Sequence, residues 1–407
     1  MTEIAMSYDV IIVGGGPVGL AAALALGRFQ DGMRVAVLDR RAFTVPNDAR
    51  AFALSAGVRR VLESLGVWPG LKAEATAITA MKITDSGRGD ISRPVFLNFE
   101  GDVAPGEPYA HMVPNRALTA ALLADAGTRA ELIGGVEIAG YEAGPATARL
   151  GLKDGRLLEA PLIVAADGAM SALRQMAGID TTGHDYGQAG VVTTITHALP
   201  HGGTAFEHFR PAGPFASLPL SGNRSSLVWT ETADEAARLK TLPLDAAAAE
   251  IEAAMGASLG AVTVEETLQS FPLRLQLARS FVGSRLALIG DAAHVIHPLA
   301  GQGLNLGFKD VAALGEVVIE AMRLGLDQGG PDVLARYEAW RRFDTALLAA
   351  VTDGLNALFS NDVAPVRALR DLGLGLVDRA APIKNALIGQ AAGLSRSGPR
   401  LLRGLPI

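Results

Sequence analysis

The stretch RLALIGDAAHVIHPLAGQGLNLGFKD, residues 285–310, decides the fold. Its first residues, Arg285 to Ile289, form a short apolar run that predicts a buried strand. Gly290 and Asp291 follow directly, so a carboxylate emerges at the carboxyl end of that strand. Ligands of open α/β sheets bind at this edge, and the pattern therefore predicts a ligand site there.

Two glycines in the same stretch precede an expected helix. Gly301 and Gly303 flank Gln302, and they let the backbone approach a planar ligand closely. An apolar pattern from Leu304 to Val318 then predicts a helix whose start points toward Asp291. The N–H groups and partial positive charge of a helix start suit an anion or an electron-rich carbonyl. An ordinary tight turn between a strand and a helix is the alternative that this stretch alone leaves open.

A second glycine cluster, GGGPVG, occupies residues 14–19. Apolar runs predict a strand before it, a helix after it, and a second strand that ends at Asp39. This is the dinucleotide-binding fingerprint in its βαβ context, and an acid that binds ribose hydroxyls favours NAD or FAD. The residues expected to bind the dinucleotide are Gly14, Gly16, Pro17, Val18, Gly19 and Asp39.

Four arginines lie near these motifs. Arg40 and Arg41 follow Asp39, and we interpret them as solvated charges rather than a 2′-phosphate site, with Arg40 kept as a candidate cofactor contact. Arg50 is expected near the start of a helix that residues 48–55 open, and Arg116 near the start of a helix that continues to Ala126. Each could also pair with a surface carboxylate.

Composition narrows the class of protein. The 407 residues are 49% hydrophobic, which is enough for two or three domains with a substantial core. The net charge of −6 and the lack of any block of consecutive Lys or Arg longer than a pair argue against a nucleic-acid partner. The absence of cysteine excludes disulfides, thiolate metal sites and a cysteine nucleophile, and we expect no metal. The apolar run 10–26 is broken by glycines and Pro17, so we predict neither a signal peptide nor a membrane span and expect a cytoplasmic protein.

The middle of the chain holds another acid at a strand end. An apolar run from Leu162 to Ala166 leads into Asp167 and Gly168, and Ser171 then caps an expected helix that carries Arg174. Before it, segments 131–138, 146–153 and 156–162 predict strands that form a meander. After it, residues 189–264 alternate and turn repeatedly, which predicts a mostly antiparallel sheet with one helix inserted at 245–255. The last part of the chain is expected to be largely helical.

The three motifs, in this order, resemble those of the FAD-dependent aromatic hydroxylases, whose fold is that of p-hydroxybenzoate hydroxylase. HPLAGQGLNLGFKD at 297–310, the strand Leu227–Trp229 and LRDLGLGLVDRAAPIKNALIGQAAGL at 369–394 are similar to one branch, the ubiquinone-biosynthesis hydroxylases. The resemblance implies an α/β fold with a Rossmann-like FAD-binding domain of the glutathione-reductase type, a mostly antiparallel β-sheet substrate domain and C-terminal helices. The FAD-binding domain would comprise residues 1–75, 105–185 and 270–330, the substrate domain 76–104 and 186–269, and the helical region 331–407.

The resemblance also implies cofactors and roles. FAD would be bound non-covalently, with Asp291 on the ribityl chain and with Asp167 and Arg174 near the pyrophosphate and the nicotinamide approach. No second glycine fingerprint is present, so NAD(P)H would bind transiently as the reductant. The flavin environment expected to be catalytic is Pro298, Gly301, Gln302 and Gly303. Further expected FAD contacts are Arg50, Arg116, Gly290, Leu304 and Asn305.

The implied reaction is hydroxylation of the aromatic ring of a polyprenylated phenol in ubiquinone biosynthesis, with O2 adding to flavin C4a and the hydroperoxide transferring one oxygen. His294 and His297 invite a role as general base, but a histidine beside a proline in a turn more often satisfies backbone groups, so none is assigned. Trp229 is interpreted as a core residue. A flavin halogenase, a prenyl reductase, a hydroxylase of a small soluble phenol and a non-catalytic dinucleotide-binding subunit are the alternatives.

The C-terminal segment is unusually basic. Between Ala364 and Ile407 it carries seven Lys or Arg and two Asp, a net charge of +5. With its apolar runs, this segment would either contact an anionic inner membrane or a partner protein of the same pathway, or cover the flavin domain. The sequence is also compatible with a homo-oligomer.

Overall fold

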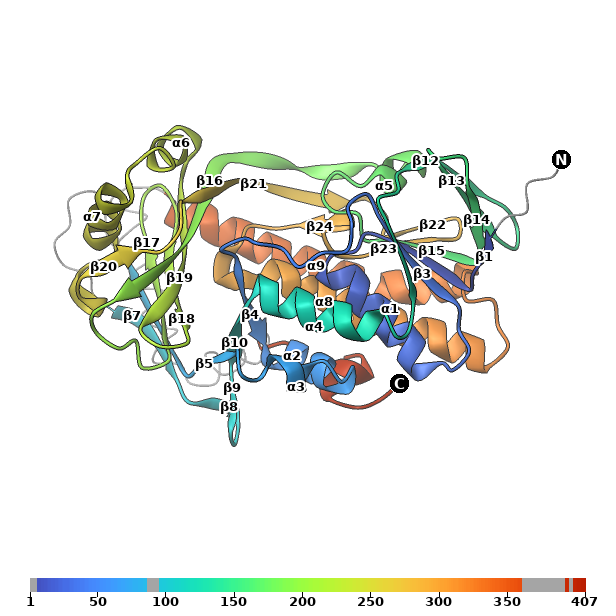
Figure 1. The fold of residues 1–407 in the computed structure, drawn as a ribbon, viewed down its shortest axis with the longest axis horizontal. Helices are drawn as coiled ribbons and strands as arrows, with labels where there is room; N and C mark the ends of the chain where they lie inside the picture. The colour runs from blue at the N-terminus through green and yellow to red at the C-terminus, as the bar shows by residue number, and fades with distance from the viewer. Residues whose placement is uncertain (1–5, 86–94, 361–391, 395–397) are drawn as a thin grey trace.

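The computed structural model describes residues 6–85, 95–360, 392–394 and 398–407. Two lobes lie side by side, a six-stranded sheet in one and a nine-stranded sheet in the other (Figure 1). Three helices run along the middle of the molecule: α1 (Pro17–Phe29), α8 (Gln302–Arg323) and α9 (Pro331–Phe359). The basic segment that the sequence singles out lies mostly outside the described residues.

The six-stranded sheet forms the dinucleotide-binding core that the glycine fingerprint predicts. Its strand order brings together all three acid-bearing strand ends, because β2, β3, β15 and β23 are parallel neighbours. These strands are apolar and buried, as expected where helices cover a parallel sheet. In order across the sheet, the strands are β11 (Glu131–Gly134), β3 (Val35–Asp39), β2 (Val10–Val13), β15 (Leu162–Ala165), β23 (Leu286–Leu288) and β22 (Val282–Gly283).

The nine-stranded sheet is mostly antiparallel, as the alternating sequence predicts. Its two longest strands, β16 and β21, run along the top of the view and join the two lobes (Figure 1). β16 continues across the expected domain limit at 185, and β21 continues across the one at 270. The domain boundaries stay a prediction. The strands in order are β24 (His294–Val295), β21 (Gln269–Ala278), β16 (Thr181–His197), β19 (Arg224–Thr232), β18 (Phe215–Leu220), β17 (Thr204–Phe209), β6 (Ala80–Asp85) and β7 (Val95–Glu100), with β20 (Val262–Val264) beside β16.

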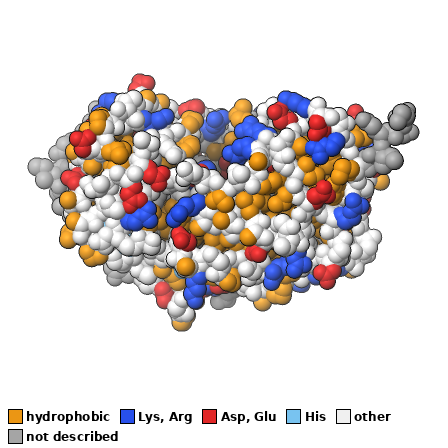
Figure 2. All heavy atoms as spheres, viewed as in Figure 1, with side chains coloured by type: hydrophobic (Ala, Val, Ile, Leu, Met, Phe, Trp, Pro, Cys, Tyr) orange, Lys and Arg blue, Asp and Glu red, His pale blue; other side chains and the backbone are white. Residues whose placement is uncertain are grey.

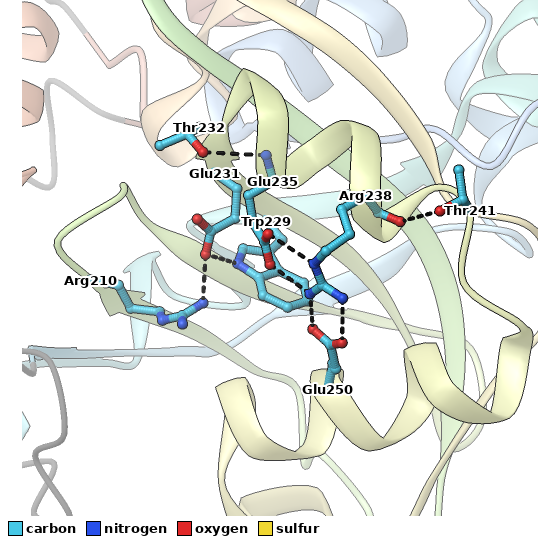
Figure 3. A network of polar contacts seen from close by, with 8 residues as sticks. All are labelled: Arg210, Trp229, Glu231, Thr232, Glu235, Arg238, Thr241 and Glu250. Carbon is cyan, nitrogen blue, oxygen red and sulfur yellow. Dashed lines mark hydrogen bonds and ion pairs between the residues drawn. The ribbon is translucent and has the colours of Figure 1, made fainter.

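One face of this sheet packs against helices α6 (Ala233–Leu239) and α7 (Leu244–Met255). Trp229 lies in that core, as predicted, edge-on to Phe215 at 5.5 Å. Its Nε1 donates to the buried carboxylate of Glu231 at 3.0 Å, and Arg210 reaches the same carboxylate at 3.1 Å (Figure 3). Nearby, Arg238 of α6 pairs with Glu250 of α7 and fixes the two helices to each other (Figure 3). The helices thus occupy this face, which leaves the opposite face for a ligand.

Two local predictions are wrong. Residues 51–55 form strand β4 (Ala51–Ser55) instead of a helix, because β10 (Ala110–Pro114) pairs with the whole segment. The helix, α2 (Ala56–Ser64), begins only after Ser55, whose Oγ accepts from the Val58 amide. The first strand predicted for the meander, β11, does not belong to it, because β11 pairs with β3 in the parallel sheet. The meander that remains is β12 (Ile138–Ala143), β13 (Ala148–Leu152) and β14 (Leu157–Ala160), with β1 (Met6–Ser7) beside β14.

Other predicted elements are confirmed. Helix α4 (Asn115–Ala126) and the Ser171-capped helix α5 (Ala172–Met176) lie where the sequence places them. The remaining short elements are α3 (Trp68–Leu71), β5 (Thr76–Ile78), β8 (Asp102–Ala104) and β9 (Glu107–Pro108).

In the parts of the chain that the structure describes, no helix is both long and apolar enough to cross a membrane. On the face shown in Figure 2, acidic and basic side chains are interspersed over both lobes, without the basic stripe that nucleic acid requires.

Candidate active site

A cavity of about 1120 Å³ lies where the two sheets meet. The ends of β2, β3, β15 and β23 border it on one side, and the free face of the nine-stranded sheet borders it on the other. The start of α8 and the C-terminal half of α9 complete its wall. The cavity therefore brings the three sequence motifs together with the expected substrate sheet.

The glycine turn is shaped for a dinucleotide. Gly14 has φ +117°, and a Cβ on it would lie 2.1 Å from the Ala166 carbonyl oxygen. A Cβ on Gly19 would lie 1.9 Å from the Gly14 oxygen, so both positions require glycine for packing. At Gly16 a Cβ would meet nothing within 4 Å, because this residue borders the cavity at the start of α1, where no side chain caps the helix. An uncapped helix start beside open space fits the pyrophosphate of FAD.

Two of the strand-end acids support the same fit. Asp39 borders the cavity, and its carboxylate is held by the amides of Gly15 at 2.7 Å and Arg41 at 2.8 Å. Asp167 accepts from the Ala172 amide at 2.8 Å through one oxygen, while its other oxygen is buried without a partner. Burial raises the pKa of Asp167, and the hydrogen bonds that it accepts only partly offset this effect. A buried oxygen left unpaired at the cavity indicates a hydrogen-bonding ligand there.

The third acid, Asp291, faces the cavity from a rigid corner. Asp291 is exposed to the cavity, and desolvation by the surrounding protein raises its pKa, against the lowering effect of His294 and Arg50. The preceding Gly290, at φ +58°, donates its amide to Asp310 at 2.9 Å. The same carboxylate of Asp310 contacts His294 Nε2 at 2.6 Å and Arg341 Nε at 2.7 Å, so α8 and α9 both hold the corner. Burial by itself would raise the pKa of Asp310, but its interactions with His294 and Arg341 lower it below its ordinary value.

The start of α8 forms the floor of the cavity. Gly301, at φ +63°, occupies the N-cap position, and a Cβ on Gly303 would meet nothing within 4 Å. Asn305 anchors this segment, because its Oδ1 accepts from the Ser55 amide at 2.9 Å and its Nδ2 donates to the carbonyls of Ala53 and Gly301. The residues predicted to form the flavin environment thus lie together at this end of the cavity, and their role stays a prediction. Those that border the cavity are Pro298, Gly301, Gln302, Gly303, Leu304 and Asn305.

The arginines divide into two groups. Arg40 and Arg50 border the cavity as expected, although Arg50 also pairs with Asp48 at 2.8 Å. Arg174 does not border it: its buried guanidinium donates to the carbonyls of Ala169 and Ala292. Arg116 is exposed and pairs with Glu74 at 3.5 Å, also away from the cavity wall. The expectation that Arg116 and Arg174 contact FAD directly is not supported; Arg174 instead ties the Asp167 corner to the Asp291 corner.

The two histidines also differ. His294 is structural, as expected, because it is committed to Asp310. His297 contradicts the expectation, since it is fully buried and neither ring nitrogen has a partner. It lies edge-on to Tyr186 at 5.1 Å, behind the cavity wall, and burial lowers its pKa to about 4. A neutral imidazole that does not border the cavity is not placed to act as a general base. Among the described residues, no cluster of His, Asp or Glu could hold a metal ion.

The substrate side of the cavity follows the two-residue period of β-strands. On each of four neighbouring strands, two residues in alternate positions border the cavity. Of the residues between them, Val191 and Trp229 lie in the core with α6 and α7. The sequence contains this alternation, but it does not say which face is free. The bordering pairs are Gly190 and Val192, Ala216 and Leu218, Val228 and Thr230, and Phe271 and Leu273. Sequence reasoning also missed Asn115, Glu207, Lys309 and Asp344, which border the cavity as well.

A dinucleotide lying along the glycine turn and past Asp291 would have its ring system at the start of α8, facing this apolar sheet. That arrangement is the one a flavin-dependent ring hydroxylase needs. Residues 7–350 match the family described as FAD binding domain, and the chain belongs to that family. It is an FAD-dependent aromatic hydroxylase of the ubiquinone-biosynthesis branch, as the sequence motifs indicate.

Relatives and solved structures agree over nearly the whole chain. Ubiquinone hydroxylase UbiL of Rhodospirillum rubrum is 42% identical over 408 residues, which cover 98% of this chain and 93% of the relative. The 3-demethoxyubiquinol 3-hydroxylase of Escherichia coli is 34% identical, covering 95% of this chain and 98% of that protein. The crystal structure of p-nitrophenol 4-monooxygenase PnpA from Pseudomonas putida superposes with a TM-score of 0.80 at 19% identity, over 97% of this chain and 100% of that one, and so shares the fold.

Proposed function

We propose that this protein adds one oxygen atom from O2 to the aromatic ring of a polyprenylated phenol in ubiquinone biosynthesis, with NAD(P)H as reductant. The observation that carries the proposal is the cavity in which the strand-end acids and the glycine turn face an apolar sheet. The relatives described above are named a ubiquinone hydroxylase and a 3-demethoxyubiquinol 3-hydroxylase, which supports a substrate of the ubiquinone class.

The chain's own residues have separable tasks. The start of α1 and Gly16 would hold the pyrophosphate, Asp39 a ribose, and Asp291 the ribityl chain. The first-turn amides of α8 would stabilise negative charge on the isoalloxazine edge. Leu218, Val228 and their neighbours would hold the phenol ring and exclude water, which matters because water promotes loss of the activated oxygen. FAD, when bound, supplies the oxygen activation itself.

The proposal also includes the reductant NAD(P)H and contact with a membrane. The single glycine fingerprint is used by FAD, so the nicotinamide would bind only while it delivers hydride. The substrate's polyprenyl tail partitions into lipid, and we therefore include peripheral contact with the inner membrane and with other proteins of the pathway in the proposal.

The test uses the purified holoenzyme with NADH or NADPH, ¹⁸O2 and two phenols that differ only in carrying or lacking a prenyl tail. We expect the prenylated phenol to gain one ¹⁸O atom and the reductant to be consumed in step with product. Deletion of the gene should also cause accumulation of a prenylated precursor lacking one oxygen. Hydroxylation of the bare phenol alone would overturn the assignment in favour of a small soluble substrate.

A further inference from the structure

Helix α9 exposes an unusually apolar face. Sixteen large hydrophobic side chains are exposed in the described parts of the chain, and six of them belong to this one helix. Phe343 is the most exposed of the six, at 76%. A surface helix normally presents polar residues to solvent, so this pattern calls for a ligand or partner. The six are Trp340, Phe343, Leu347, Val351, Leu355 and Leu358.

The face has little charge. Between Ala339 and Leu355, Arg342 is the one exposed cation, and the two carboxylates, Asp344 and Asp353, are only about one-third exposed and are paired with neighbouring side chains. The other exposed positions are alanine, glycine or large hydrophobic residues. The opposite side of α9 is packed against the protein, where Tyr337, Arg341 and Thr345 are buried. The exposed face is therefore a fixed surface of the folded protein.

The face continues into the cavity. Val351 and Leu355 both border the cavity, yet they are 45% and 36% exposed. They thus lie at its rim, with Leu348 and Thr352 further along the wall. In Figure 1 the C-terminal end of α9 lies beside the nine-stranded sheet, where the substrate ring would bind. An unbroken apolar path leads from the substrate side of the cavity onto the outer face of α9.

The other end of the cavity is unsuited to an apolar tail. Asp39, Arg40, Arg41 and Glu137 border it there, at the expected place of the adenine nucleotide. Removing such charges from water beside a hydrocarbon chain would be unfavourable. A substrate with its ring near the start of α8 and a long apolar tail would therefore leave through an apolar part of the rim, and Val351 and Leu355 form such a part on α9.

We infer that the outer face of α9 from Trp340 to Leu355, hereafter the α9 face, docks on the surface of a lipid bilayer from which the polyprenyl substrate enters the cavity. The inference rests on the proposed function for its substrate. A bilayer fits better than a second copy of the chain, because a protein seated on the α9 face would close the rim that the tail must pass. Arg342 favours anionic lipid, and Trp340 has the character of residues that lie at the lipid–water interface.

The test compares two double variants of the FAD-loaded full chain in sedimentation with phosphatidylethanolamine–phosphatidylglycerol vesicles. Phe343→Ser with Leu347→Ser removes the centre of the α9 face. Leu324→Ser with Leu326→Ser is the matched control, since these residues are exposed to 73% and 55% in the loop before α9. We expect the first variant to lose at least tenfold in vesicle partitioning and the control to bind like the parent, with FAD content unchanged in both.

A second measurement needs no variant. Trp68 and Trp229 are buried, so a blue shift of tryptophan emission on adding vesicles would come from Trp340. No vesicle binding by the parent, or equal loss in both double variants, would overturn the inference. Conversion of a dimer into a monomer by the α9-face variant, without a change in vesicle binding, would assign the face to a second copy. Hydroxylation of a prenylated phenol in detergent tests the proposed function separately, because it needs no vesicle.

Discussion

At the cofactor end of the cavity the surface is made by the backbone, whereas at the substrate end it is made by side chains. Gly14, Gly16 and Gly19 shape the first by having no Cβ, and buried hydrogen bonds such as those to Asp310 hold its corners. Alternate residues of the nine-stranded sheet shape the second, and most of their side chains are apolar. Changes at the first end should therefore lower stability or FAD binding, while changes at the second end should alter the preference for substrate.

The largest expected effect concerns Asp310. Replacing it with asparagine (Asp310→Asn) leaves the buried Arg341 without one of its charged partners and should cost roughly 3–5 kcal/mol of unfolding free energy. Asp291→Asn is the matched comparison: its pKa is raised by desolvation, so loss of its charge should not destabilise the FAD-free protein but should lower FAD retention. Urea unfolding of the two FAD-free variants measures their free energies of unfolding. Equal losses of unfolding free energy in Asp310→Asn and Asp291→Asn would contradict the distinction between the two acids.

The next effect is a pH dependence of the unfolding free energy, and it comes from His297. His297 takes up a proton at about pH 4 in the folded protein, whereas its ordinary pKa is 6.5. Between these values the unfolded chain binds more protons, so lowering the pH from 6.5 to 4 should remove roughly 3 kcal/mol of stability. This contribution is fully present above pH 6.5. In His297→Leu that part of the pH dependence should vanish, and an unchanged slope in thermal or urea unfolding would show that His297 is not its source.

A smaller effect separates two glycines of one turn. Gly19→Ala would place a methyl group 1.9 Å from the Gly14 oxygen and should destabilise even the FAD-free protein, by about 1–3 kcal/mol. Gly16→Ala meets no protein atom, so the FAD-free protein should unfold as the parent does while FAD affinity falls. Calorimetry with and without FAD distinguishes the two. A destabilised FAD-free Gly16→Ala protein would mean that the open space at Gly16 serves packing and not the cofactor.

The smallest effect tests the substrate end. Leu218→Gln places an amide on the apolar wall and should lower kcat/KM for a prenylated phenol about tenfold, with FAD content and stability nearly unchanged. Ser217→Ala is the control, because Ser217 does not border the cavity and its buried hydroxyl makes no hydrogen bond. Loss of FAD from Leu218→Gln would show that the two ends are not independent.

Local chemistry explains why the cofactor end could be predicted closely. A glycine needed for a turn, a proline at a helix start and an acid at the end of an apolar run act over a few residues, so Gly14, Pro17, Asp39 and Asp291 are found where the sequence puts them. The same reasoning failed at residues 51–55. Their helix-like composition is overridden by pairing with β10, a partner far along the chain.

The sequence by itself determined the βαβ core, the order of the three motifs and the alternation of the substrate strands, because each depends on neighbouring residues. Tertiary structure decided the rest. It decided that Arg174 braces two corners instead of meeting the cofactor, that Asp310 and Arg341 hold Gly290, and that one sheet face is free while α6 and α7 cover the other. It also decided that α9 buries one side and exposes an apolar one, since burial depends on which distant segments pack together, and hydrophobicity alone does not specify the partner.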